Sequence, residues 1–147
     1  MKKIIFLAFL FAMANIVSAQ TTKVQGGATE AGKQHKIVFQ VTSDDTLVHK
    51  SLMKQLKNIL SVEPGTKLEV VCHGPGLYMM VKDKTLFQEQ IKLLKEKGVQ
   101  FAACEFAMAE RKISKEQLVA EAGTVRSGIL EIASKQEEGW SYIKSGF

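Results

Sequence analysis

The sequence has little excess charge, no internal repeat and no low-complexity block. Its 20 lysine and arginine residues stand against 15 aspartate and glutamate residues in a chain of 147 residues, and the two signs are interspersed along the chain. It has no basic stripe with interleaved aromatic residues, so a nucleic acid is not an expected partner. A chain of this length without repeats is expected to form one domain around a single core.

The sequence also lacks the usual patterns for metal and phosphate binding. Of its 3 histidines, His35 and His49 stand at no metal-ligand spacing from Cys72 or Cys104. The Gly-Pro-Gly run at 74–76 has neither the glycine spacing of a phosphate loop nor the Lys-Ser or Lys-Thr that follows one. We therefore expect no metal ion and no cofactor.

The first 19 residues have the three parts of a secretory signal peptide. Two lysines precede an apolar stretch at residues 4–13, and Val-Ser-Ala at 17–19 is a small-residue cleavage site. An uncleaved anchor is the competing interpretation, but the stretch is shorter than the ~20 residues of a membrane span. No cysteine follows Ala19, so a lipid anchor is not indicated. We expect cleavage after Ala19, export to a periplasm and no membrane attachment of the mature protein.

The rest of the chain divides into a leader and a domain. Residues 20–35 hold almost no large apolar side chain, which is typical of a flexible leader. Residues 36–147 alternate between short apolar runs and amphipathic segments, as strands and helices do in an α/β domain. Strands are expected at 36–42, 67–72, 99–104, 124–126 and 140–143, and helices at about 46–60, 84–97 and 128–138.

This alternation predicts a single-domain α/β fold. About five mainly parallel strands would be covered by helices on both faces, because each parallel connection needs a crossover. By analogy with the flavodoxin-like doubly wound arrangement, the first three strands would lie in the order 2-1-3. Gly128 would let the last helix begin close to the sheet. Trp140, at the start of an edge strand, would offer an apolar face for subunit packing.

Cys104 is the first candidate for chemistry, because it ends the apolar run VQFAAC. Ligands and reactive groups collect at the carboxyl ends of parallel strands. If a helix starts directly after Cys104, its free N–H groups would favour a thiolate, which is the nucleophilic form. The alternative is a small buried side chain with no reactivity, which is the commoner role of a free cysteine.

Cys72 and His73 are weaker candidates at the end of the second strand. In the order 2-1-3, one strand would separate Cys72 from Cys104, so their Cα atoms would be roughly 10 Å apart. That distance is too long for a disulfide without movement of the backbone. Cys72 could react with the thiol of a partner or, after a slow rearrangement, with Cys104; the commoner role is to fill space at the strand end. His73 could hold a thiolate or move a proton, or could simply bind loop backbone, which is the commoner role.

Three motifs resemble those of the DsrE/DsrF-like family of sulfur-relay proteins. They are HGPG at 73–76, GVQFAAC at 98–104 and QEEGWSYIK at 136–144. The resemblance runs from about residue 36 to residue 144 and implies a compact α/β subunit that forms small homo-oligomers. It also implies a persulfide on the cysteine after the third strand, which is Cys104, and a protein that donates or accepts sulfur.

Two hypotheses follow from these observations. The first is an exported thiol-based sulfur carrier, or a sulfurtransferase-like protein, in which Cys104 is the nucleophile and His73 assists. The second is a non-catalytic exported oligomeric binding module in which Cys104 is buried and inert. Many exported proteins of the family that the sequence resembles place a small polar Asn-Thr pair shortly after this cysteine, whereas Glu105 follows Cys104 here. A carboxylate beside the thiol opposes its ionisation.

Overall fold

The three central strands of the sheet are short apolar runs because helices cover both of its faces. The computed structural model describes residues 34–146. Its strands are β1 (Lys36–Val41), β2 (Lys67–Cys72), β3 (Gln100–Cys104), β4 (Gly123–Val125) and β5 (Ser141–Ser145). All neighbouring strands pair in parallel, in the order β4-β3-β2-β1-β5.

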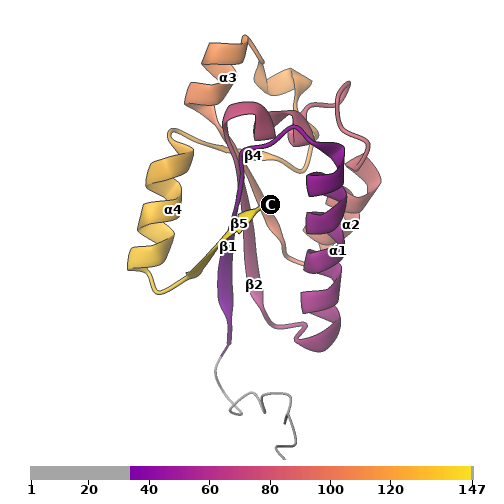
Figure 1. Cartoon of the computed structure of the whole chain (residues 1–147), viewed down its shortest axis with the longest axis vertical. Coiled ribbons are helices and arrows are strands. Elements are labelled where there is room, and N and C mark those ends of the chain that lie inside the picture. The colour runs from indigo at the N-terminus through magenta and orange to yellow at the C-terminus, as the bar shows by residue number, and fades with distance from the viewer. Residues whose placement is uncertain (1–33, 147) are drawn as a thin grey trace, which may run out of the picture. The chain divides into compact units, whose positions relative to one another are not determined.

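Helices lie on both faces of this sheet and above its carboxyl edge. They are α1 (Thr46–Val62), α2 (Gln88–Glu96), α3 (Glu105–Arg111) and α4 (Gly128–Glu137), with short 3₁₀ helices η1 (Gly74–Met80) and η2 (Lys115–Gln117). Figure 1 shows α1 and α2 on one face, α4 on the other and α3 beyond the carboxyl ends of the strands. The predicted α/β class, the five parallel strands and the two helical layers are confirmed.

The predicted strand order 2-1-3 is wrong, because β2 lies between β1 and β3. The chain steps in one direction from β1 to β4 and then returns across the sheet to place β5 beside β1. Right-handed crossovers in opposite directions put their helices on opposite faces, which explains why α4 stands alone on its side. The choice between the two orders depends on this long-range return and not on any local pattern.

The return creates a switch point between β3 and β4. The chain leaves β3 into α3, which packs against η1, whereas it leaves β4 into α4 on the opposite face. In open α/β sheets, ligands bind in the crevice outside the carboxyl ends of the strands at such a point. Cys104, the last residue of β3, lies there.

An ion pair and an aromatic ring fix α4 to the sheet. Glu69 on β2 is buried, with 3% of its surface exposed, and its carboxylate lies 3.0 Å from the Lys135 ammonium of α4. Lys135 also lies 4.9 Å from the centre of the Trp140 ring. Trp140 is only 8% exposed and packs under α4, so the prediction that it offers a free face for subunit packing is wrong.

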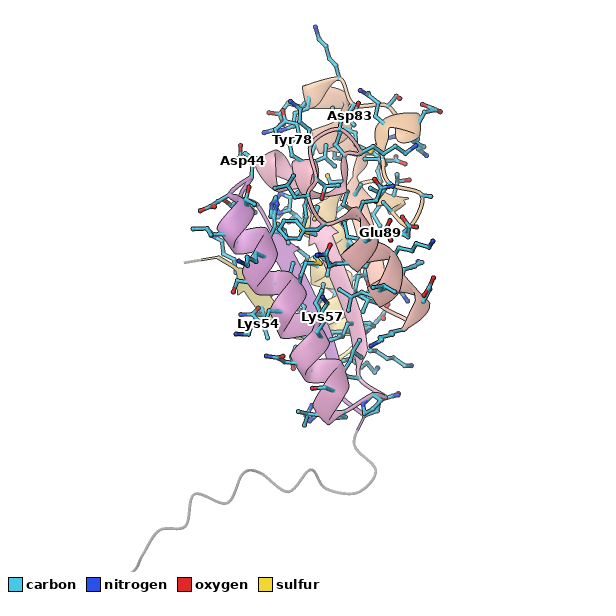
Figure 2. The ribbon with its side chains drawn as sticks, turned by 90° about the vertical axis from the view of Figure 1, so that its right-hand side faces the viewer. Asp44, Lys54, Lys57, Tyr78, Asp83 and Glu89 are labelled. Carbon is cyan, nitrogen blue, oxygen red and sulfur yellow. The ribbon has the colours of Figure 1, made fainter. Side chains whose placement is uncertain are left out.

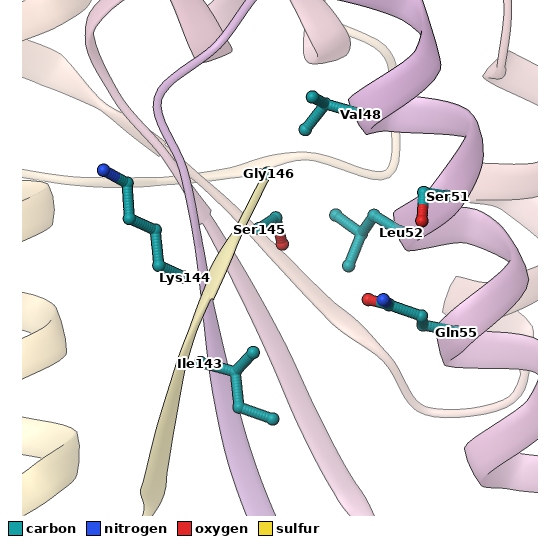
Figure 3. Close-up of a pocket in the computed structure, with 8 residues that line it drawn as sticks. All are labelled: Val48, Ser51, Leu52, Gln55, Ile143, Lys144, Ser145 and Gly146. Carbon is teal, nitrogen blue, oxygen red and sulfur yellow. The ribbon is translucent and has the colours of Figure 1, made fainter.

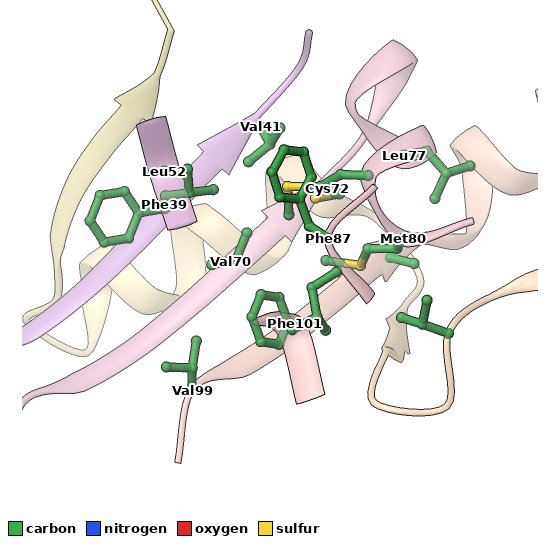
Figure 4. Close-up of a cluster of buried hydrophobic side chains, with 14 of the residues drawn as sticks. Phe39, Val41, Leu52, Val70, Cys72, Leu77, Met80, Phe87, Val99 and Phe101 are labelled. Atoms are coloured by element: carbon green, nitrogen blue, oxygen red, sulfur yellow. The ribbon is translucent and has the colours of Figure 1, made fainter. Parts of the chain in front are cut away.

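The larger core lies between the sheet and the layer of α1, α2 and η1. Phe39, Leu52, Val70 and Phe101 are among its buried side chains (Figure 4). Figure 2 shows the outer side of this layer, where Lys54 and its charged neighbours extend from the helices into solvent. The interspersed charges of the sequence thus form a solvated face.

Local side chains cap α1 and η2, and one helix boundary differs from the prediction. Asp45 caps α1 by accepting a hydrogen bond from the Leu47 N–H, and Ser114 and Gln117 form a capping box at η2. The helix expected from residue 84 begins at Gln88, because residues 81–85 form a turn in which two N–H groups donate to the Val81 carbonyl.

Some expectations fall beyond the part of the chain that the structure describes. The predicted signal peptide (1–19) and nearly all of the predicted leader (20–35) lie outside residues 34–146. Within residues 34–146, no helix is both long enough and apolar enough to cross a membrane.

Candidate functional site

The Cys104 thiol lies against the first turn of α4. Its Sγ accepts a hydrogen bond from the Gly128 N–H at 3.2 Å, and Cys104 is 6% exposed. Gly128 is the first residue of α4, and Ser127 before it caps the helix by accepting from the Leu130 N–H. The sulfur therefore faces the amino end of a ten-residue helix, where free N–H groups and the helix dipole stabilise negative charge.

This donor helix differs from the one that the sequence suggested. The helix that follows Cys104 directly, α3, does begin at Glu105, but it has only seven residues and the Cys104 side chain caps none of its N–H groups. The N–H group that reaches Sγ comes from residue 128, 24 positions along the chain. Local pattern at residues 99–111 carries no sign of that contact.

Glycine at position 128 makes the contact possible. A Cβ placed there would lie 3.2 Å from Val71 Cγ1 and 3.3 Å from the Cβ atoms of both Cys104 and His73. These distances are shorter than ordinary van der Waals contacts, so a larger residue would push α4 away from the sheet. The prediction that Gly128 brings the helix close to the sheet is confirmed.

The carboxylate of Glu105 is occupied by partners of its own. It accepts a hydrogen bond from the Thr124 hydroxyl at 2.9 Å and lies 3.2 Å from the Lys115 ammonium. The Thr124 hydrogen bond, followed by the contact with Lys115, lowers the pKa of Glu105. The negative charge next to the thiol in sequence is thus balanced by a lysine.

Cys72 lies in the larger core and is fully buried. Burial raises the pKa of the Cys72 thiol far above its ordinary value, so the thiol is held protonated. Cys72 on β2 is paired in register with Ala103 on β3, and Cys104 follows Ala103 on that strand. Because side chains alternate along a strand, Cys72 and Cys104 face opposite sides of the sheet. Both thiols are free, but the predicted reason, an intervening strand, is wrong.

His73 lies beside Gly128 and belongs to a side-chain network. Its Nε2 lies 2.8 Å from the Gln40 Nε2, and the Gln40 Oε1 accepts a hydrogen bond from the Tyr142 hydroxyl. Burial lowers the pKa of His73. The structure therefore brings Cys104 and His73 together around Gly128 and leaves Cys72 on the other face of the sheet.

Sequence reasoning identified neither Gln40 nor Tyr142 as a site residue and gave Gly128 only a structural role. Gln40 did carry a signal, since it is a polar residue within the apolar strand KIVFQV. Polar residues of buried strands usually have a specific partner. That partner could not be named before the strand order was known.

Apolar side chains are exposed in the first turns of α3 and α4. Phe106 is 57% exposed, and Ile129 and Leu130 are 56% and 67% exposed. The Arg126 guanidinium lies 5.1 Å from the centre of the Phe106 ring. We call these four residues the rim; they lie within three residues of Cys104 or Gly128 along the chain.

The pocket in Figure 3 is a separate feature. It has a volume of about 100 Å³ and lies between α1 and β5, lined by residues such as Ser51, Gln55 and Ser145. None of the candidate residues from the sequence lines it. Among residues 34–146, no group of three or more His, Cys, Asp or Glu side chains could hold a metal ion.

Comparison with known proteins shows the family to which this chain belongs. The model of the DsrE/DsrF-like family matches residues 11–145, and the chain belongs to that family. The match begins inside the predicted signal peptide. The family is associated in general with sulfur relay. No curated protein matches the sequence.

Solved structures with the same fold come from archaea and bacteria. The MTH1491 protein of Methanobacterium thermoautotrophicum, of unknown function, is 25% identical, with a TM-score of 0.72 over 76% of this chain and 99% of that one. The ychN protein of E. coli is 11% identical, with a TM-score of 0.64 over 76% and 99%. The BT1422 protein of Bacteroides thetaiotaomicron, also of unknown function, is 13% identical, with a TM-score of 0.59 over 74% and 93%.

Proposed function

We propose that this protein is an exported thiol-based sulfur carrier that holds sulfur as a persulfide on Cys104. The observation that supports this most is the hydrogen bond from the Gly128 N–H to the Cys104 Sγ at the switch point of the sheet. A sulfur atom at a helix amino end is in a setting that stabilises its anionic form, and a persulfide is also an anion near neutral pH.

The proposed step exchanges one sulfur–sulfur bond for another. The Cys104 thiolate attacks the outer sulfur of a donor persulfide, R–S–SH. The bond between the two donor sulfurs breaks, a bond between Cys104 Sγ and the outer sulfur forms, and R–S⁻ leaves. The proton lost from Cys104 is balanced by the protonation of R–S⁻, so no external oxidant or reductant is needed. Delivery to an acceptor thiol is the same exchange in reverse.

The surroundings of the two thiols support Cys104 as the reactive one. Cys72 is fully buried and its pKa is raised, whereas Cys104 keeps some exposure and a polar donor. The exposed rim beside Cys104 supports a protein as sulfur donor or acceptor, or a second subunit in a homo-oligomer, because exposed apolar clusters mark interaction surfaces. Export rests on the signal-like sequence of residues 1–19.

The test is the mass of the intact protein after exposure to polysulfide. Wild type is expected to gain one or more sulfur atoms, and the gain should disappear on treatment with a reductant. Cys72→Ser should keep the gain and Cys104→Ser should lose it. A gain that follows Cys72, or the same gain in Cys104→Ser, would contradict the assignment.

One observation favours the second candidate, a non-catalytic binding module. Cys104 is only 6% exposed, which is typical of an inert core cysteine. In that case wild type should gain no sulfur, and Cys104 should react with a thiol reagent only after unfolding. Cys104→Ser should then also retain every partner of the wild-type protein.

A further inference from the structure

A chain of hydrogen bonds crosses three neighbouring strands and ends at His73. The Tyr142 hydroxyl on β5 donates to the Gln40 Oε1 on β1. The Gln40 amide nitrogen lies 2.8 Å from the Nε2 of His73, which follows β2 directly. The sheet order β2-β1-β5 makes these three residues neighbours, although Tyr142 is 102 positions from Gln40 along the chain and His73 is 33 positions from it.

With the Gln40 amide oriented as it is in the structure, this series of hydrogen bonds has a direction, and that direction determines which nitrogen of the His73 ring carries the hydrogen. A hydroxyl that donates to the Gln40 oxygen leaves the amide NH₂ group facing His73, and an amide NH₂ group only donates. The Nε2 of His73 must therefore accept, so it carries no hydrogen. A neutral ring then carries its hydrogen on Nδ1, the opposite of the form that free histidine prefers, and a protonated ring cannot accept at all.

The same ring lies at the thiol site. The Cβ atoms of His73 and Cys104 are both 3.3 Å from the position that a Cβ of Gly128 would take, so the two side chains start from neighbouring points beside the first residue of α4. Within residues 34–146 the structure gives Nδ1 of His73 no hydrogen-bond partner. The charged group nearest to this network in register is Lys144, which pairs with Gln40 across β1 and β5.

We propose that Gln40 and Tyr142 are positioning residues that keep His73 neutral with its hydrogen on Nδ1, and that this N–H binds the outer sulfur of a persulfide on Cys104. The binding of the outer sulfur by the His73 N–H, which we call the sulfur half of the proposal, rests on the proposed function; the effect of Gln40 and Tyr142 on the ring is the positioning half. The interaction is a hydrogen bond, so no covalent bond forms or breaks and the proton stays on His73. The Gly128 N–H would bind the inner sulfur, so the site holds both sulfurs of the persulfide.

The positioning half is tested by long-range proton–nitrogen correlation NMR of the His73 ring. Wild type should show the Nδ1–H form. Gln40→Glu places an oxygen acceptor opposite Nε2 and should move the hydrogen to Nε2. Tyr142→Phe releases the amide and should lower the ratio of Nδ1–H to Nε2–H by about fivefold, the effect of one ordinary hydrogen bond. Tyr78→Phe, the matched control outside the network, should match wild type.

An Nε2–H form in wild type, or no change in Gln40→Glu, would overturn the positioning role. A purely structural role for Gln40 would change the stability of these variants but not the position of the ring hydrogen. The NMR result does not depend on sulfur chemistry, so it stands whether or not Cys104 carries a persulfide.

The sulfur half is tested by the rate at which persulfide on Cys104 passes to a small thiol such as dithiothreitol. Gln40→Glu and His73→Gln should both change that rate by about fivefold or more, and Tyr78→Phe should not. Equal rates in all variants would overturn the sulfur half and leave the carrier function intact. Absence of any persulfide in wild type would refute the carrier function itself, and the sulfur half with it.

Discussion

Replacing Gly128 by alanine tests the contact on which the site depends. The new Cβ would lie 3.2–3.3 Å from three atoms, two of which are Cβ atoms fixed to the backbone and one of which, Val71 Cγ1, belongs to a core strand. None of the three is the far end of a flexible side chain, so α4 itself must move by a few tenths of an ångström.

The loss of stability can be estimated from the overpacking that forces this movement. Overpacking a well-packed site costs roughly 1–3 kcal/mol, and alanine recovers at most about 1 kcal/mol through its better helix propensity. Taking the middle of the overpacking range, about 2 kcal/mol, and subtracting a recovery of about 0–1 kcal/mol, we expect Gly128→Ala to lower the free energy of unfolding by about 1–2 kcal/mol. Because the Gly128 N–H moves with the helix, the reactivity of the Cys104 thiol towards a small thiol reagent should change as well.

Urea unfolding followed by circular dichroism measures this free energy, and Gly123→Ala is the matched control. A Cβ on Gly123 would meet its nearest atom, the Phe101 carbonyl oxygen, at an ordinary distance of 3.6 Å. The control should stay within about 0.5 kcal/mol of wild type. If Gly128→Ala were as stable as wild type with unchanged thiol reactivity, the close approach of α4 to Cys104 would be refuted.

Three other perturbations have expected outcomes in urea unfolding. Gly76→Ala would place its Cβ 2.2 Å from the Val41 carbonyl oxygen, so we expect the free energy of unfolding to fall by more than about 3 kcal/mol, or the protein to be insoluble. A variant as stable as wild type would contradict that contact. Burial lowers the pKa of His73 below its ordinary 6.5, so the folded protein loses stability as the pH falls below 6.5 through the folded-state pKa. His73→Gln should therefore lose less stability than wild type between about pH 7.5 and 5.5. An equal loss in the two proteins would contradict the lowered pKa. Lys135→Met leaves the buried Glu69 carboxylate without its ion-pair partner and should lower the free energy of unfolding by about 3 kcal/mol. Adding Glu69→Gln should restore most of that loss. If the effects of the two substitutions simply added, the ion pair would be contradicted.

Local features of the fold could be predicted from the sequence because their causes are local. The Asp45 cap, the Ser114–Gln117 capping box and the apolar strands each depend on residues within a few positions of one another. The placement of Cys104 at the carboxyl end of a strand follows from the same kind of pattern. These signals are sufficient for the fold class and for the main candidate residue.

The remaining features depend on which strands are neighbours. The sequence does not distinguish the order 2-1-3 from the observed order, and the error changed the expected relation between Cys72 and Cys104. The contact of Gly128 with Cys104 and the chain from Tyr142 to His73 both join segments that meet only after the return through α4. Trp140 was misplaced because the burial of an edge residue depends on the helix above it.

The reactivity of the two cysteines in the native protein distinguishes a sulfur carrier from a protein whose cysteines are inert. Each single-cysteine variant, Cys72→Ser and Cys104→Ser, is treated with a small alkylating reagent under native conditions and in steps of urea. Cys104 should react in the native state at a rate that does not follow the population of unfolded protein, whereas Cys72 should react only as the protein unfolds. If the Cys104 rate also followed unfolding, Cys104 would be an inert core residue and the carrier account would be contradicted.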